Sequence, residues 1–175
     1  MSVISIGIAH RGVVVVGVIY EPTRDEMFTA IRGQGALLNG VRIRVATPDG
    51  LRNALFGFGT HNNPKVGHAM LRAADGFVDT ARGLRMLGSS ACALAYIACG
   101  RLGGFFEIDL SSWDLAAGSL IVTEAGGRIT DTLNQPFTLA TRDVLASCNA
   151  GTIHAEASNL LINARAATSD DVYQN

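Results

Sequence analysis

The first part of the chain, residues 1–47, has the alternating pattern of an antiparallel β-meander. Apolar residues alternate with small or polar ones near the start, and a β-branched run that is apolar on both faces follows. Such a run favours a central strand with a neighbour on each side. Strands are predicted at residues 3–9, 13–20, 26–31 and 41–45. Asn39-Gly40, just before the last of them, tolerates the positive φ angles of a type I′ hairpin turn.

From residue 48 onward, short apolar runs alternate with segments of helical spacing, which predicts an α/β part at residues 48–167. Its strands are expected at residues 55–59, 85–87, 104–108, 128–130 and 144–148. Its helices are expected at residues 66–74, 89–99, 114–125 and 153–166. The two central helices are apolar nearly all round, which indicates that they are buried between layers.

Together the two parts predict an α+β fold in a single domain of residues 1–175, with residues 168–175 as a mobile tail. Hydrophobic residues make up 48% of the chain and charged residues 17%, a composition that can bury a core. The formal net charge of −1 provides no field to attract nucleic acid or an anionic membrane. Three cysteines without metal-ligand spacing, and no secretory signal, favour a cytoplasmic protein with reduced thiols.

The segment Gly88-Ser89-Ser90-Ala91 places small residues where the helix at residues 89–99 is expected to begin. The first backbone N–H groups of a helix have no intrahelical partners, and the helix dipole is positive there. A phosphate could therefore bind at this point, because small side chains would let it approach. The alternative is that Ser89 or Ser90 acts only as a helix N-cap.

Two carboxylates are candidates for chemistry near the next helix. Glu107 lies at the end of a predicted strand, and Asp114 opens the helix that follows it. Asp114 could cap that helix or present its carboxylate to a hard cation such as Mg²⁺. Glu107 could line a polar cleft with Asp114 or be solvated, and Asp109 is a weaker candidate between them. No nucleophile elbow, phosphate-binding P-loop or zinc-binding helix motif is present in the sequence.

Residues 113–127 read Trp-Asp-Leu-Ala-Ala-Gly-Ser-Leu-Ile-Val-Thr-Glu-Ala-Gly-Gly. This segment resembles the C-terminal signature of the inositol monophosphatase family, in which Trp-Asp-x-Ala-Ala-Gly precedes an aliphatic stretch and Glu-Ala-Gly-Gly. Other segments resemble the family in the same order: residues 5–7, 17–22, 33–40, 85–91 and 103–107. The resemblance covers roughly residues 3–148.

The resemblance implies a layered αβαβα fold, incomplete at its N-terminus, and Mg²⁺-dependent hydrolysis of a small phosphomonoester by a metal-activated water. Asp114 would be the catalytic residue, a Mg²⁺ ligand that also contacts the substrate. Gly88, Ser89 and Ser90 would bind phosphate or a sugar hydroxyl, and Glu107 would accept a hydrogen bond from a substrate hydroxyl. Members of the family are often homodimers, so a homodimer is expected as well.

Glu107 suits a polyol hydroxyl, so inositol monophosphate is the preferred substrate. Histidinol phosphate, fructose 1,6-bisphosphate and 3′-phosphoadenosine nucleotides remain alternatives, because relatives with similar signatures hydrolyse them.

The family's Asp-Pro-x-Asp-Gly-Thr motif, which supplies most of its metal ligands, has no counterpart here, since the sequence contains no Asp-Pro dipeptide. One aspartate cannot hold several Mg²⁺ ions, so little activity is expected from these residues alone, and apolar surface is expected to be left uncovered. The alternative function is a non-catalytic relative that binds a phosphorylated ligand or a partner chain.

Overall fold

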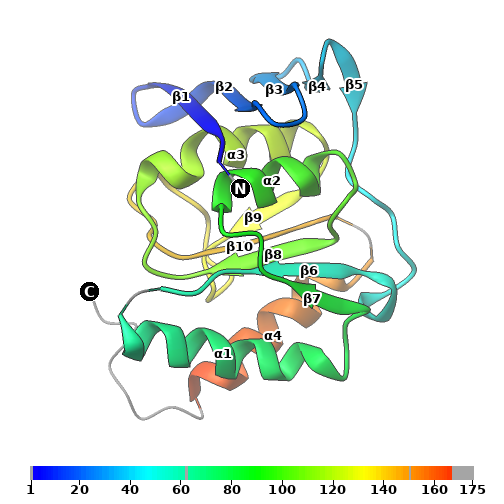
Figure 1. The fold of residues 1–175 in the computed structure, drawn as a ribbon, viewed down its shortest axis with the longest axis vertical. Helices are drawn as coiled ribbons and strands as arrows, with labels where there is room; N and C mark the ends of the chain where they lie inside the picture. Colours follow the sequence, from blue (N-terminus) through cyan, green and yellow to red (C-terminus); the bar gives the residue numbers. More distant parts are fainter. Residues whose placement is uncertain (1, 62, 150, 167–175) are drawn as a thin grey trace.

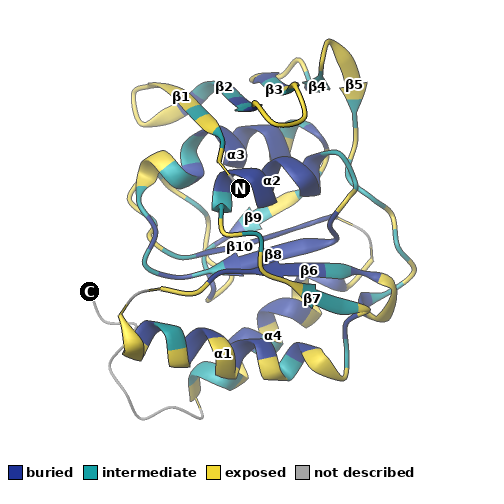
Figure 2. Ribbon diagram, viewed as in Figure 1, coloured by how far each residue is buried: buried dark blue, intermediate teal, exposed yellow. Residues whose placement is uncertain are grey.

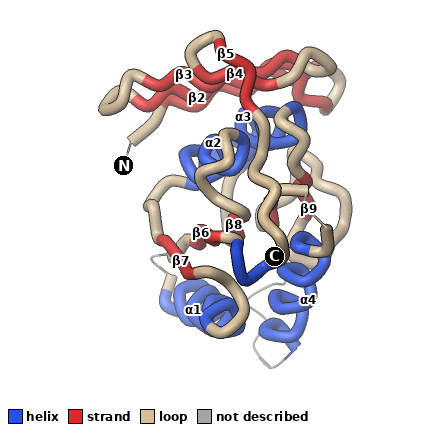
Figure 3. Tube along the Cα trace, turned by 90° about the vertical axis from the view of Figure 1, so that its right-hand side faces the viewer, coloured by secondary structure: helices blue, strands red, loops and turns tan. Residues whose placement is uncertain are grey.

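The computed structural model describes residues 2–61, 63–149 and 151–166. These residues build four layers: an antiparallel sheet, a pair of helices, a mixed sheet and a second pair of helices (Figure 1). The side view in Figure 3 shows the first sheet lying over the helices α2 and α3. The predicted α+β class is confirmed. The outer helical layer that αβαβα would place on the far side of the first sheet is not among the described residues.

The first sheet is the predicted meander, with strand order β1-β2-β3-β4-β5 and every pairing antiparallel. Its strands are β1 (Ile4–His10), β2 (Val13–Glu21), β3 (Glu26–Ile31), β4 (Ala36–Leu38) and β5 (Val41–Ile43). β2 is an interior strand, as its apolar run predicts. Strand β4 was missed by the sequence analysis, because three residues between two glycine-containing turns are too short for a readable alternation.

The second sheet has the order β7-β6-β8-β10-β9, and β6 pairs parallel with both β7 and β8. Its strands are β6 (Leu55–Phe58), β7 (Gly83–Arg85), β8 (Gly104–Glu107), β9 (Arg128–Thr130) and β10 (Val144–Ser147). The strand predicted at residues 85–87 is wrong by two residues and is β7 instead. A short 3₁₀-helix at Leu51–Asn53 was also not predicted.

The four α-helices are α1 (Pro64–Val78), α2 (Ser90–Ala98), α3 (Ser112–Glu124) and α4 (Ile153–Ala166). Helix α1 is longer than predicted at both ends, with Asn63 as its N-cap and Pro64 in its first turn. The structure confirms that α2 and α3 are buried between the sheets. Helix α3 approaches the first sheet closely where its alanines face a glycine of β2: a Cβ atom on Gly17 would lie 2.6 Å from the carbonyl oxygen of Ala117.

Two apolar cores lie on opposite faces of the second sheet (Figure 2). The upper core joins the first sheet, α2 and α3, and the lower one joins α1 and α4. In the lower core, Phe77 of α1 stacks on Phe106 of β8 with ring centroids 4.7 Å apart. No helix in the described ranges is long and apolar enough to cross a membrane. The tail predicted at residues 168–175 lies outside the described residues.

Candidate functional site

A cavity of about 550 Å³ opens where the parallel strands of the second sheet end. Gly59 and Thr60 follow β6, Met86 follows β7, and Glu107 ends β8, so the carboxyl ends of neighbouring strands meet there. This edge is where ligands bind in open α/β sheets. The first sheet and the helix starts complete the lining, through Ser2, Val3, Ser5, Phe58, Gly88, Ser89, Ser90, Ala91, Phe105, Trp113 and Asp114.

The start of α2 forms one wall of the cavity. Ser89 is the N-cap, and its hydroxyl accepts a hydrogen bond of 3.3 Å from the Cys92 N–H. Gly88, with φ at +74°, turns the chain into the helix at a backbone conformation that other residues rarely adopt. The N-cap interpretation therefore holds for Ser89, and the anion interpretation remains compatible with it. Ser90 and Ala91 line the cavity, and they lie in the first turn of α2, where backbone N–H groups have no intrahelical partners.

Glu107 is the half-buried acid of the cavity. Its Oε2 accepts a hydrogen bond of 2.6 Å from the Ser90 hydroxyl. Burial raises the pKa of the Glu107 carboxyl above its ordinary value, and the negative charge of Asp114 adds to this, while Ser90 and His61 act in the opposite direction. The structure thus brings the sequence-predicted residues Ser90, Glu107 and Asp114 into one cavity, where Ser90 and Asp114 both act on the Glu107 carboxyl.

Asp114 is the third residue of α3, whereas the sequence analysis expected it to open the helix. Ser111 is the N-cap, and the Asp114 Oδ2 accepts a hydrogen bond of 2.9 Å from the Ser111 N–H, which makes a capping box. Both interpretations of this carboxylate are compatible with the geometry, because one oxygen caps the helix while the side chain lines the cavity.

Asp109, the weaker candidate, is held elsewhere. Its backbone has φ at +61°, and its carboxylate accepts a hydrogen bond of 2.7 Å from Arg142 and lies 3.5 Å from the His61 ring. Asp109 is not among the residues that line the cavity. We therefore take Asp109 as part of a surface ion pair with Arg142 and not as part of the cavity.

The acidic residues present do not by themselves fit a Mg²⁺ site. Mg²⁺ requires near-octahedral coordination by oxygen, yet the described ranges contain no group of three or more acidic, histidine or cysteine side chains that could hold a metal ion. Asp114 can offer one carboxylate oxygen, while Glu107 is already hydrogen-bonded to Ser90. Other residues would have to complete the coordination sphere.

The sequence analysis missed Gly59, Thr60, Met86, Trp113 and Ser5, although all of them line the cavity. For Gly59, Thr60 and Met86 a signal was available, because each follows a strand that runs parallel to its neighbour. Ser5 could not be found in this way, since it comes from the first sheet; its hydroxyl donates to the Trp113 carbonyl oxygen across 3.4 Å.

Comparison with known proteins gives one consistent result. Residues 1–166 match the model of the inositol monophosphatase family. The chain is 44% identical over 147 residues to inositol monophosphatase 2 of Solanum lycopersicum, covering 82% of this chain and 56% of that protein. It is 40% identical over 129 residues to the Nus factor SuhB of Haemophilus influenzae, covering 73% of this chain and 48% of that protein.

The fold agrees with the same group of proteins. The solved structure of an inositol monophosphatase from Anabaena superposes with a TM-score of 0.85 at 34% identity. The match covers 92% of this chain and 64% of that one. The chain thus spans about half the length of the curated relatives it matches.

Proposed function

Because the chain belongs to the inositol monophosphatase family, we propose that it acts in the hydrolysis of a small phosphomonoester, with inositol monophosphate as the preferred substrate. The observation that carries the proposal is the cavity itself. It joins a helix N-terminus suited to phosphate, a carboxylate suited to a hydroxyl group, and a second carboxylate suited to a cation.

Each predicted residue takes a role in this proposal. The start of α2, at Gly88, Ser89 and Ser90, binds the phosphate through backbone N–H and hydroxyl groups. Glu107 accepts a hydrogen bond from a hydroxyl of the substrate's alcohol portion, and the hydrogen bond from Ser90 holds the Glu107 carboxylate in its orientation. Asp114 contributes one ligand to Mg²⁺ and contacts the substrate.

Magnesium remains a proposal, because the described residues provide only part of its coordination sphere. The same observation favours a second candidate function, in which the chain binds a phosphorylated ligand without hydrolysing it. The two functions share the cavity and differ in whether turnover occurs and whether Mg²⁺ is needed for it.

The experiment is phosphate release from inositol 1-phosphate, with and without Mg²⁺, alongside calorimetric binding of the same compound. Turnover that requires Mg²⁺ and is lost in Asp114→Asn supports the hydrolase. The amide oxygen of the substituted side chain can still accept the Ser111 hydrogen bond, so the variant should fold. Asp75→Asn, an exposed change on α1 remote from the cavity, is the control that should leave turnover unchanged.

Binding without turnover, unchanged by Mg²⁺, supports the second function. Histidinol phosphate, fructose 1,6-bisphosphate and a 3′-phosphoadenosine nucleotide complete the substrate panel. Absence of both turnover and binding across this panel would reject both functions for this chain.

A further inference from the structure

The four residues between β8 and α3 determine how the two carboxylates of the cavity lie relative to each other. Glu107 ends β8 and Asp114 lies in the first turn of α3, so the positions of both depend on the path of the loop between them. Ile108 and Leu110 in this loop are buried, the first in the lower core and the second in the upper core. Asp109, between them, is only half-buried.

Asp109 has a backbone conformation that the loop must hold in place. Its φ of +61° lies in the left-handed region, which aspartate tolerates better than most residues but does not favour. The partners of its carboxylate come from two other loops. Arg142, in the β9–β10 loop, donates a hydrogen bond of 2.7 Å to Oδ1. The Nε2 atom of His61, in the β6–α1 loop, lies 3.5 Å from Oδ2.

Arg142 holds the β8–α3 loop at two points. Besides the hydrogen bond to Asp109, its backbone carbonyl oxygen accepts a hydrogen bond of 2.7 Å from the Leu110 N–H. The place of Arg142 follows from the register of β10 beside β8 (Figure 1). Val144 lies opposite Glu107, so two residues farther on, past the ends of the strands, Arg142 comes opposite Asp109. Opposite charges across a strand pair favour such a register.

We propose that Arg142 is a positioning residue of the candidate site, which holds the β8–α3 loop so that Glu107 and Asp114 keep their places in the cavity. This role rests on the proposed function, in which Glu107 binds a hydroxyl group of the substrate. The Arg142 side chain is 55% exposed, and an ion pair of this kind contributes little to stability. Its influence on the site can be larger, because a displacement of about 1 Å is enough to impair binding or catalysis.

The effect of Arg142 should fall on the alcohol portion of the substrate, because the start of α2, which binds the phosphate in the proposed function, lies outside the β8–α3 loop. The test is calorimetric binding of inositol 1-phosphate and of inorganic phosphate, both without Mg²⁺. Arg142→Ala should bind inositol 1-phosphate about three- to ten-fold more weakly, since the hydrogen bond to Glu107 is weakened. Its affinity for inorganic phosphate and its urea midpoint should stay near those of the wild type.

Arg128→Ala is the matched control, because it also removes an exposed arginine, one with a hydrogen bond of 3.0 Å to Asn134. Arg128 does not line the cavity, so the affinities for both ligands should be unchanged. Equal weakening of both ligands by Arg142→Ala would indicate a general loss of structure and would overturn the positioning role.

Two variants of Asp109 separate the contact with Arg142 from the backbone conformation. Asp109→Asn tolerates the left-handed region and can still accept a hydrogen bond from Arg142, so it should keep most of the affinity for inositol 1-phosphate. Asp109→Gly adopts the conformation without strain but offers no acceptor, so it should weaken binding as Arg142→Ala does. Combining Asp109→Gly with Arg142→Ala should add little further loss. Wild-type affinity in Asp109→Gly would overturn the proposal.

Hydrogen exchange tests the loop without any ligand. The N–H groups of Leu110 and Ser111 are hydrogen-bonded, to the Arg142 carbonyl oxygen and to Asp114. A peptide that spans residues 108–114 should therefore exchange faster in Arg142→Ala than in the wild type or in Arg128→Ala. Unchanged exchange would show that Arg142 does not hold the loop.

The binding data distinguish failure of this role from failure of the proposed function. A wild-type chain that binds no inositol 1-phosphate would overturn the proposed function, and with it the role of Arg142 at the site. Binding that is equally tight in the wild type and in Arg142→Ala would overturn the role of Arg142 alone.

Discussion

Gly59 leaves the space that the Glu107 carboxylate occupies. Gly59 follows β6 and Glu107 ends its parallel neighbour β8, and a Cβ atom placed on Gly59 would overlap the carboxylate carbon and oxygens of Glu107. Glu107 can therefore point toward Ser90 because residue 59 has no side chain that would occupy the same space.

Gly59→Ala should displace Glu107 without unfolding the protein, because a flexible carboxylate can move where backbone cannot. Loss of a hydrogen bond to a charged group costs about 1.5–3 kcal/mol, so inositol 1-phosphate should bind at least about ten-fold more weakly. Calorimetry measures this. Inorganic phosphate, which has no hydroxyl for Glu107 to bind, should keep its affinity. Gly76→Ala, where a Cβ meets only ordinary contacts, is the control. A wild-type affinity for inositol 1-phosphate would contradict the role of Gly59.

The approach of the first sheet to α3 provides a contrasting glycine. A Cβ on Gly17 would lie 2.6 Å from the Ala117 carbonyl oxygen, and backbone on both sides leaves no flexible group to move. Gly17→Ala should therefore lower the free energy of unfolding by about 1–3 kcal/mol, as overpacking does. Urea denaturation measures the change. Gly76→Ala in α1 is again the control, and should be neutral or stabilising because alanine favours helix. An unchanged midpoint for Gly17→Ala would show that the layers can separate at little cost.

Much of this architecture could be predicted from the sequence. The meander was predicted because its alternation repeats over several strands, and the buried helices because α2 and α3 have no polar face. The positions of Glu107 and Asp114 suggested a shared polar cleft, and the resemblance of several segments to the family, residues 85–91, 103–107 and 113–127, added Ser90 and the roles of all three. Glu124, in the same signature, does not line the cavity: it accepts hydrogen bonds of 2.7 Å from the N–H groups of Gly33 and Gly35. That contact spans about ninety residues of sequence, so no local pattern could reveal it.

The buried histidine of α4 gives the protein a pH-dependent stability. His154 lies between the hydroxyl groups of Ser147 and Thr130, at 2.8 and 3.0 Å. Burial lowers the pKa of His154 to about 4, and the charge of Arg128 adds to this effect. The folded protein thus favours the neutral ring, whereas the unfolded chain takes up a proton near pH 6.5. The contribution of neutral His154 to the free energy of unfolding is therefore fully present above pH 6.5 and is lost as the pH falls toward 4.

Between pH 7 and pH 5 this loss should reach about 2 kcal/mol. Urea unfolding at these two pH values measures it. In His154→Gln the loss that arises from this residue should vanish, although the variant is expected to be less stable at pH 7 through its altered hydrogen bonds. His68→Gln, at an exposed position on α1, should keep the wild-type dependence. A dependence in His154→Gln equal to that of the wild type would show that other groups cause it.

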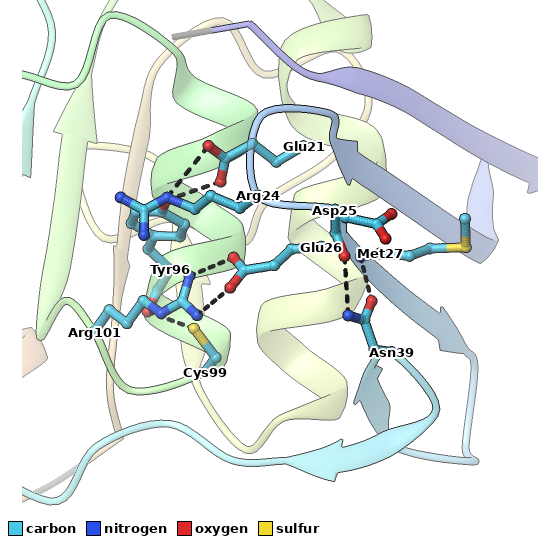
Figure 4. Close-up of polar contacts among 9 residues, drawn as sticks. All are labelled: Glu21, Arg24, Asp25, Glu26, Met27, Asn39, Tyr96, Cys99 and Arg101. Atoms are coloured by element: carbon cyan, nitrogen blue, oxygen red, sulfur yellow. Dashed lines mark hydrogen bonds and ion pairs between the residues drawn. The ribbon is translucent and has the colours of Figure 1, made fainter.

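The buried carboxylate of Glu21, at the β2–β3 turn, is hydrogen-bonded to the hydroxyl of Tyr96 (Figure 4). Glu21 is only 2% exposed, and its Oε2 accepts a hydrogen bond of 2.9 Å from the Tyr96 hydroxyl of α2. Its other oxygen lies 3.5 Å from Arg24, an exposed side chain. Burial and the hydrogen bond to Glu21 both raise the pKa of Tyr96, so the hydroxyl stays protonated and remains a donor.

Tyr96→Phe should therefore lower the free energy of unfolding by about 2 kcal/mol, because a buried charged acceptor loses its main donor while the ring still packs. Tyr20→Phe is the matched control. Tyr20 donates a hydrogen bond of the same length to Asp25, but that bond is exposed to water, which can replace the hydroxyl. Urea denaturation of the two variants side by side should show a much larger change for Tyr96→Phe. Equal changes in the free energy of unfolding would mean that the buried Tyr96–Glu21 hydrogen bond contributes no more than the exposed Tyr20–Asp25 one. Arg24 would then compensate Glu21 for the lost donor.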